Sequence, residues 1–175
     1  MSCKKGYYCS GAGTSLHTPT ICEAGKYCPE GASSATNCPE GTYNPSTGRY
    51  DLTHCLSCEP GYYCPATTSS LTGLDCPAGK YCNYRAGNAY SGTCAIGQFC
   101  PLGSVLPTEC TPGKYCGAAD LGAESGNCDA GYYCTLSATT SLGSGQCPSG
   151  TYCPAQSALP SPCLPGTFSN AVGAT

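Results

Sequence analysis

The chain has 175 residues, of which 19 are cysteine, 24 glycine and 15 proline. Leu, Ile, Val and Phe together number 18, about 10% of the chain, well below the roughly 20% at which a hydrophobic core becomes doubtful. Seven basic and ten acidic residues give a formal net charge of −3, and Lys4 and Lys5 are the only adjacent basic pair. This composition argues against a conventional enzyme core, a nucleic-acid-binding patch and a membrane-spanning segment.

The cysteine content is typical of an oxidising compartment. The first residues, Met1 to Gly6, nonetheless lack the apolar run of a secretory signal. We therefore expect the sequence to be an internal piece of a longer secreted or surface protein. Its expected location is extracellular or at the cell surface, which includes the surface of a cilium or flagellum.

One short sequence motif recurs ten times along the chain. Each copy begins with a cysteine, which we number position 0 of its repeat. Successive opening cysteines lie 16 to 20 residues apart. Glycine occupies position 3 of every repeat, Tyr or Phe occupies position 5, and in eight repeats a second cysteine at position 6 completes the pattern C-x5-C. A constant period in units too small to bury a core predicts that neighbouring repeats stack in line. The opening cysteines are Cys3, Cys22, Cys38, Cys58, Cys76, Cys94, Cys110, Cys128, Cys147 and Cys163.

The fixed positions predict the local structure of each repeat. Glycine at position 3 suits a turn whose third residue has a positive φ, which glycine adopts without steric cost. The ring at position 5 is expected to cover a neighbouring disulfide. The connectors are rich in Ser, Thr, Ala and Gly and show no helical spacing of apolar residues. We therefore expect small disulfide-rich repeats of loops and short β-strands, almost no helix, and an elongated rod.

The first part of the chain contains one irregular repeat. Residues 1–37 hold two repeats with the full C-x5-C pattern. Residues 38–57 hold a repeat with Asn44 at position 6, so that a single bridge from Cys38 to Cys55 is expected there.

The second part is more regular. Residues 58–162 hold six full repeats, which we expect to be grouped in three pairs. Residues 163–175 begin a further repeat with Ser169 at position 6. The partner of Cys163 is expected beyond Thr175.

The spacing of the remaining cysteines leaves three disulfide schemes open. In the first scheme, consecutive cysteines form groups of four. Within each group, the first cysteine pairs with the third and the second pairs with the fourth. In the second, the closing cysteine of each repeat bonds to the opening cysteine of the next. In the third, each C-x5-C closes on itself. Because the count of 19 is odd, one cysteine has no partner within the sequence, Cys163 in the first scheme and Cys3 in the second.

The phrase C-P-x-G-x-Y resembles the cysteine-rich GCC2/GCC3 and ephrin-receptor-like repeats, and the run from Cys38 to Cys58 is similar to the cysteine-rich modules of tumour necrosis factor receptors. Long arrays of this kind look most like surface proteins of ciliates and algae, including the hair-like mastigonemes of their flagella. The receptor modules pair four cysteines in crossed fashion, so the resemblance implies the first scheme. That scheme pairs Cys3 with Cys22, Cys9 with Cys28, Cys58 with Cys76, Cys64 with Cys82, Cys94 with Cys110, Cys100 with Cys116, Cys128 with Cys147 and Cys134 with Cys153, and it leaves Cys163 unpaired.

Candidates for site chemistry are few. His17 and His54 are the only histidines, and His54 adjoins Cys55, the expected partner of Cys38, which favours surface histidines over a Cys/His nucleophile. Cys55 and Cys58 have the C-x-x-C spacing of zinc ligands, but the six-residue spacing that dominates elsewhere favours disulfides. We therefore expect no catalytic residue, no metal and no cofactor.

Partners are indicated only weakly. The Ser/Thr clusters at 67–70 and 139–141 are candidates for O-linked glycans, although solvated linkers would have the same composition. Tyr7, Tyr62 and Tyr132 precede the fixed ring and are candidates for contacts between rods. We expect partners among copies of this chain or other surface and filament proteins, with no nucleic acid and no direct membrane insertion.

These observations favour a non-enzymatic extracellular structural protein, a disulfide-laddered rod that contributes to a surface filament, ciliary hair or coat. The alternative is the ligand-binding ectodomain of a cell-surface receptor. A receptor would bind a protein partner saturably, whereas a structural rod would associate into fibres.

Overall fold

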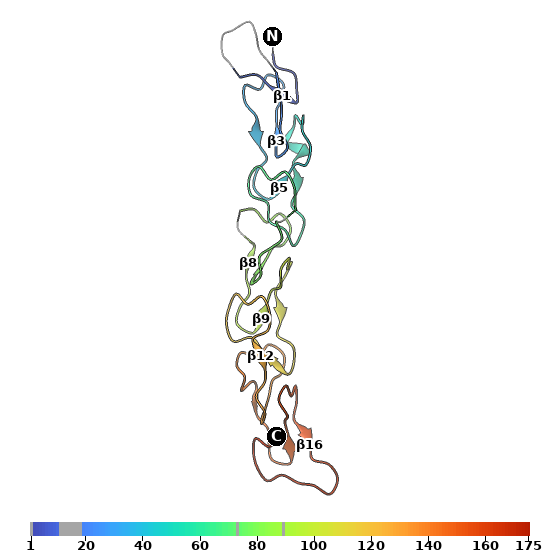
Figure 1. Cartoon of the computed structure of the whole chain (residues 1–175), viewed down its shortest axis with the longest axis vertical. Helices are drawn as coiled ribbons and strands as arrows, with labels where there is room; N and C mark the ends of the chain where they lie inside the picture. The colour runs from blue at the N-terminus through green and yellow to red at the C-terminus, as the bar shows by residue number, and fades with distance from the viewer. Residues whose placement is uncertain (1, 11–18, 73, 89) are drawn as a thin grey trace. The chain divides into compact units, whose positions relative to one another are not determined.

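The computed structural model describes residues 2–10, 19–72, 74–88 and 90–175. The chain forms two compact units, Met1–Cys76 with Cys82–Ser91 and Pro77–Tyr81 with Gly92–Thr175. Each unit is a series of small hairpins joined by loops (Figure 1). The one helical element among the described residues is the three-residue 3-10 turn η1 (Leu52–His54).

Short antiparallel hairpins are the regular structure of both units, as predicted. Sixteen two-residue strands are found in the described residues, and each pairs with its neighbour in sequence. In every pair, positions 4 and 5 of one repeat face the two residues that precede the next opening cysteine. An isolated antiparallel bridge between Tyr62 and Asp75 occupies the same place in the repeat opened by Cys58.

The strand bounds follow the repeat closely. The first unit contains β1 (Tyr7–Tyr8) with β2 (Thr20–Ile21), β3 (Lys26–Tyr27) with β4 (Thr36–Asn37), and β5 (Thr42–Tyr43) with β6 (Leu56–Ser57). The second unit contains β7 (Lys80–Tyr81) with β8 (Gly92–Thr93), β9 (Gln98–Phe99) with β10 (Thr108–Glu109), β11 (Lys114–Tyr115) with β12 (Gly126–Asn127), β13 (Tyr132–Tyr133) with β14 (Gly145–Gln146), and β15 (Thr151–Tyr152) with β16 (Ser161–Pro162).

The predicted turn is present in all ten repeats. The glycine at position 3 has a φ between 76° and 89° in every case, as the third residue of a type II turn requires. The turn is closed by the N–H of position 4, which donates to the carbonyl of position 1, as in the 3.0 Å bond from Gln98 to Ala95. The chain therefore reverses at the same point of each repeat.

The disulfides differ from the crossed scheme. Each C-x5-C closes on itself, and the eight bridges join Cys3 to Cys9, Cys22 to Cys28, Cys58 to Cys64, Cys76 to Cys82, Cys94 to Cys100, Cys110 to Cys116, Cys128 to Cys134 and Cys147 to Cys153. The ninth bridge joins Cys38 to Cys55, the pair expected from the sequence, and Cys163 is free. The expected pairs Cys3 with Cys22, Cys9 with Cys28, Cys58 with Cys76, Cys64 with Cys82, Cys94 with Cys110, Cys100 with Cys116, Cys128 with Cys147 and Cys134 with Cys153 are wrong.

The physical reason is the position of the turn. Positions 0 and 6 are equidistant from the glycine at position 3, so the reversal there brings the two cysteines face to face. Their Cα atoms lie 5.7–6.1 Å apart in the eight short bridges, inside the range that a disulfide spans. The bridges consequently give no support to grouping the repeats in pairs.

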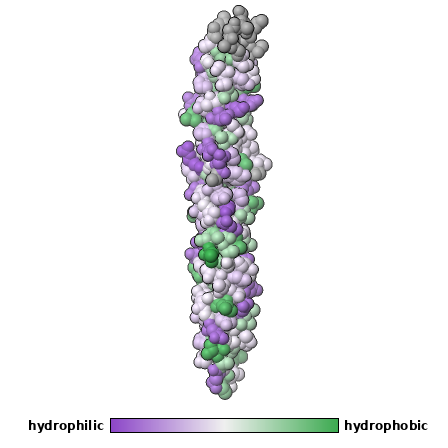
Figure 2. Space-filling model, turned by 90° about the vertical axis from the view of Figure 1, so that its left-hand side faces the viewer, coloured by the Kyte–Doolittle hydropathy of each residue, from purple (hydrophilic) through white to green (hydrophobic). Residues whose placement is uncertain are grey.

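Sulfur forms most of the core. Of the eighteen bridged cysteines, all except Cys9 and Cys55 are buried, and the only other buried apolar residues in the described part of the chain are Ala86 and Ala138. Large aliphatic side chains such as Leu102 lie on the surface. On the face shown in Figure 2, apolar side chains are scattered among polar ones and form no continuous patch. The low aliphatic content noted in the sequence thus corresponds to a core of disulfides.

Candidate functional site

The junction between consecutive repeats is formed by the same backbone hydrogen bonds along the whole array. The N–H of each glycine at position 3 donates to the carbonyl of position 6 in the next repeat, over 2.7–3.0 Å. The carbonyl of the same glycine accepts from the N–H of the next opening cysteine, over 2.8–3.2 Å. Both bonds are present in all nine junctions between the ten repeats. Each glycine therefore joins its repeat to the next one through both of its backbone polar groups.

A second left-handed residue reinforces these junctions. It lies at position 9 or 10 of nine repeats, with a φ of 60–79°. In eight repeats its N–H donates to the carbonyl of the cysteine that opens the repeat before its own, over 2.7–3.4 Å. The nine residues are Gly31, Gly48, Thr67, Arg85, Gly103, Asp120, Ser137, Gln156 and Gly173.

This second turn also leaves no room for a side chain at position 3 in seven of the repeats. The carbonyl of the left-handed residue lies directly beneath the glycine two repeats earlier, as Ser137 does beneath Gly97. A Cβ atom on Gly97 would come within 2.8 Å of the Ser137 carbonyl oxygen. Six further glycines face a carbonyl in the same way, namely Gly6, Gly25, Gly41, Gly79, Gly113 and Gly131. The junction therefore connects repeats that are two apart as well as neighbours.

The rings at position 5 pack where the sequence suggested in two repeats. Tyr63 packs against the cluster of Cys76, Cys82 and Ala86, and Tyr115 packs against the corresponding cluster around Cys128 and Cys134. In both cases the ring covers the disulfide of the next repeat. The predicted covering role of the ring is confirmed for these two tyrosines.

Asn44 takes the place of a bridging cysteine in the repeat opened by Cys38. Its side chain is 1% exposed, and its Nδ2 donates to the Lys26 carbonyl over 2.8 Å. Its Oδ1 accepts from the Ser46 N–H over 3.1 Å. A hydrogen-bonded amide thus connects this repeat to the preceding one, while Cys38 is bridged to Cys55 instead.

Replacing Asn44 by alanine should destabilise the first unit by about 1–3 kcal/mol, because the Lys26 carbonyl and the Ser46 N–H would lose their buried partner. Denaturant unfolding of the oxidised protein measures the loss. The matched control is Ser169→Ala, which alters the same position of the last repeat, where the side chain is only half-buried, and should change stability by less than about 0.5 kcal/mol. Equal losses in the two variants would show that the Asn44 amide has no structural role.

Glu124 forms the most enclosed ion pair of the described residues. Its side chain is 13% exposed and accepts from Lys114 Nζ at 2.6 Å, from the Thr111 N–H at 2.9 Å and from the Thr111 hydroxyl. Burial raises the pKa of Glu124, but the hydrogen bonds from Lys114 and Thr111 outweigh it and leave the pKa below the usual 4.5. The Glu124 carboxylate thus ties the loop that follows Cys116 to the turn that precedes β11.

This arrangement predicts an acid-dependent loss of stability. Because the folded pKa is lowered, the unfolded chain binds the proton more readily, so the contribution of Glu124 is complete above its usual pKa of 4.5 and is lost as pH falls through the folded value. Glu124→Gln should therefore unfold with a weaker pH dependence than the wild type below that pH. Glu109→Gln, at an exposed position of β10, is the control and should keep the wild-type profile. Identical profiles for wild type and Glu124→Gln would contradict the prediction.

The structure places the other candidate residues as follows. His54 stacks edge-on against Tyr50, with ring centroids 4.7 Å apart, and His17 lies outside the described residues. Cys55 and Cys58 belong to different disulfides, so neither is a free thiolate. Within the described residues, no group of three or more His, Cys, Asp or Glu side chains could hold a metal ion.

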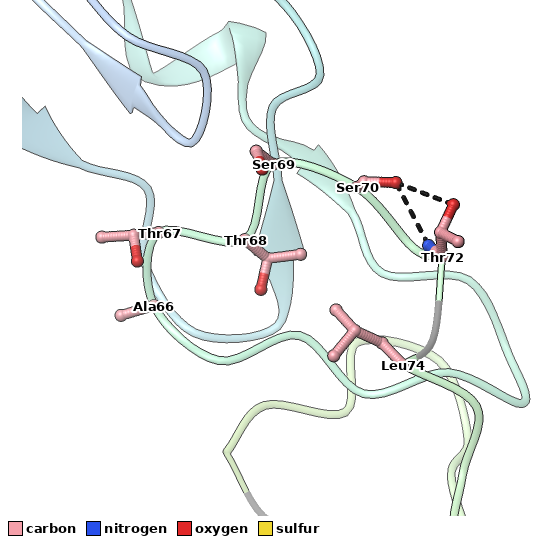
Figure 3. Close-up of a pocket in the computed structure, with 7 residues that line it drawn as sticks. All are labelled: Ala66, Thr67, Thr68, Ser69, Ser70, Thr72 and Leu74. Carbon is pink, nitrogen blue, oxygen red and sulfur yellow. Dashed lines mark hydrogen bonds between the residues drawn. The ribbon is translucent and has the colours of Figure 1, made fainter.

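The Ser/Thr cluster at 67–70 surrounds a shallow hollow of about 310 Å³, which Figure 3 shows together with Leu74. Thr67, Ser69 and Ser70 are exposed there, whereas Thr68 is buried and its hydroxyl donates to the Pro65 carbonyl. Three of the four hydroxyl residues in this candidate O-glycan cluster are therefore accessible.

The tyrosines at the fixed positions of the repeat differ in exposure from the others. Tyr7, Tyr62 and Tyr132 are half-buried, as are all tyrosines at position 5, so the three do not form the outermost rings. The exposed tyrosines are those outside the repeat pattern, Tyr50, Tyr84 and Tyr90. Sequence inspection missed them because no fixed position marks them.

The chain matches no known family model, and no curated protein is significantly similar to it. Nine disulfides are typical of a protein of an oxidising, extracellular environment. The part of the chain that the structure describes contains no helix long and apolar enough to cross a membrane.

Proposed function

We propose that this protein is a non-enzymatic extracellular structural protein, a disulfide-stapled rod that contributes to a surface filament or coat such as a ciliary hair. The observation that carries the proposal is the repeat junction, in which both backbone groups of the position-3 glycine bond to the next repeat at all nine junctions. Repeats that contact mainly their neighbours build quasi-one-dimensional structures. The resemblance to GCC2/GCC3 repeats of ciliate and algal surface proteins supports the same role.

The short disulfides suit a protein that carries mechanical tension along its chain. Each closes a loop inside one repeat, and the connection to the next repeat is made by backbone hydrogen bonds and by a ring such as Tyr63 on the next disulfide. Tension along the chain would therefore act on many equivalent junctions, while the staple keeps each turn folded. O-linked glycans on exposed hydroxyls such as Thr67 and Ser69 would fit a surface location.

Two measurements test this proposal. Small-angle X-ray scattering should give a radius of gyration well above the roughly 16 Å of a compact 175-residue globule. Negative-stain microscopy of the oxidised protein over a range of concentrations should show fibres. A chain that stays monomeric at every concentration and binds one soluble protein saturably would instead be a receptor ectodomain, and the structural proposal would be wrong.

A further inference from the structure

One tyrosine, Tyr84, combines a firmly held backbone with a side chain that is open to solvent. Eleven of the fourteen tyrosines occupy positions 4 or 5 of a repeat and are half-buried. Of the other three, Tyr84 is 62% exposed, and Tyr50 and Tyr90 are each 41% exposed. Tyr50 is engaged on its ring by Lys5 Nζ at 4.8 Å and by His54. Tyr84 is therefore the most accessible phenol of the described residues.

The backbone beneath Tyr84 is firmly held. Tyr84 lies at the tip of a turn in which the Ala86 N–H donates to the Asn83 carbonyl over 3.3 Å. The next residue, Arg85, is left-handed, with a φ of 64°, and its N–H donates to the Cys58 carbonyl over 3.1 Å. Ala86 is buried in the cluster around the Cys76–Cys82 bridge. The turn is thus fixed to the sulfur core while the side chain of Tyr84 remains exposed to solvent.

Hydrogen bonds also hold Asn83, Ser91 and Asn88 of this connector. The Ser91 hydroxyl accepts from the Asn83 N–H at 2.9 Å and donates to the Asn83 side chain at 2.6 Å. Asn88 donates to the Glu40 carboxylate, which belongs to the repeat two before its own. A rigid mount of this kind lowers the entropy cost of bringing two such phenols together.

The composition favours oxidation at tyrosine. The chain contains no tryptophan and a single methionine, and its only free thiol is Cys163. The side chains that commonly compete for an oxidant are therefore few. Apart from Cys163 and the single methionine, exposed phenols are therefore the main side chains open to an oxidant.

We propose that Tyr84 is an oxidative cross-linking site, at which the phenols of two copies of this chain couple to dityrosine. The oxidant is hydrogen peroxide used by a haem peroxidase. Each phenol gives up one electron and one proton, the two radicals form a carbon–carbon bond between their ortho positions, and one peroxide is reduced to two waters. The inference rests on the proposed structural role, because such a bond would join neighbouring rods covalently.

The test uses the full chain as a Cys163→Ser variant, so that a thiol cannot reduce the radical. A plant haem peroxidase with hydrogen peroxide should produce a covalent dimer with dityrosine fluorescence, and peptide mass spectrometry should find Tyr84 on both arms of the cross-link. Tyr84→Phe, which keeps the ring, should lose most of this dimer. Tyr115→Phe, which alters a half-buried tyrosine, should keep it.

Cross-links that involve only other tyrosines, or an undiminished dimer in Tyr84→Phe, would overturn the inference. Negative-stain microscopy of the same samples before oxidation separates this outcome from the proposed function. Fibres without coupling at Tyr84 would refute the cross-linking site alone, whereas coupling without fibres at any concentration would refute the filament.

Discussion

Complete reduction of the nine disulfides should unfold this protein at ambient temperature. Sixteen of the eighteen bridged cysteines are buried, and Ala86 and Ala138 are the only other apolar residues found buried where the structure describes the chain. A bridge that closes a six-residue loop contributes about 2.2 kcal/mol by the chain-entropy estimate. Nine bridges together exceed the roughly 5–15 kcal/mol of net stability of a typical domain. Backbone hydrogen bonds alone cannot compensate for this loss.

Circular dichroism and the dispersion of amide resonances measure the result, with free thiols counted by mass spectrometry after alkylation. The control is the same protein held in the oxidised form of the same reagent. Both signals should collapse only in the reduced sample. A dispersed spectrum that persists after all nineteen thiols have been alkylated would show that the turns and rings suffice without sulfur.

The turn and the hairpin could be predicted from the sequence because both depend on local chemistry. Glycine at position 3 is favoured by a local requirement, a positive φ, and the structure has that φ in all ten repeats. The ring at position 5 was predicted to cover a disulfide because so few other apolar side chains were available, and Tyr63 and Tyr115 do so.

The disulfide pairing was mispredicted although the deciding signal was present. A turn over positions 1 to 4 brings positions 0 and 6 close to one another, which favours closure inside the repeat over the crossed pairing of the receptor modules. The Cys38–Cys55 bridge followed from counting alone, since Asn44 leaves Cys38 without a partner at position 6. Local geometry was thus a better guide to pairing than the resemblance.

The second left-handed turn could not have been predicted. Five of its nine residues are Thr67, Arg85, Asp120, Ser137 and Gln156, which rarely adopt a positive φ. Their conformation is imposed by contacts that are distant in sequence, such as the 3.0 Å bond from the Ser137 N–H to the Cys110 carbonyl. No single-residue preference marks such a site.

Gly97→Ala should destabilise the second unit strongly. The residue has a φ of 86°, where alanine costs about 1–2 kcal/mol relative to its preferred conformations. The new Cβ would also press within 2.8 Å of the Ser137 carbonyl oxygen. Because that oxygen belongs to the backbone of a bonded turn, the clash should cost a further 1–3 kcal/mol or so. Denaturant unfolding of the oxidised protein measures the sum.

Gly150→Ala isolates the steric part of this effect. Gly150 has nearly the same φ, 81°, and makes the same junction, with its N–H donating to the Ser169 carbonyl over 2.7 Å. A Cβ on Gly150 would meet nothing within 4 Å, so only the conformational cost of about 1–2 kcal/mol applies. The difference between the two variants therefore measures how tightly repeats that are two apart pack together. If both variants lose the same stability, the Ser137 carbonyl can move away from the new Cβ at little cost. The junction would then connect only neighbouring repeats.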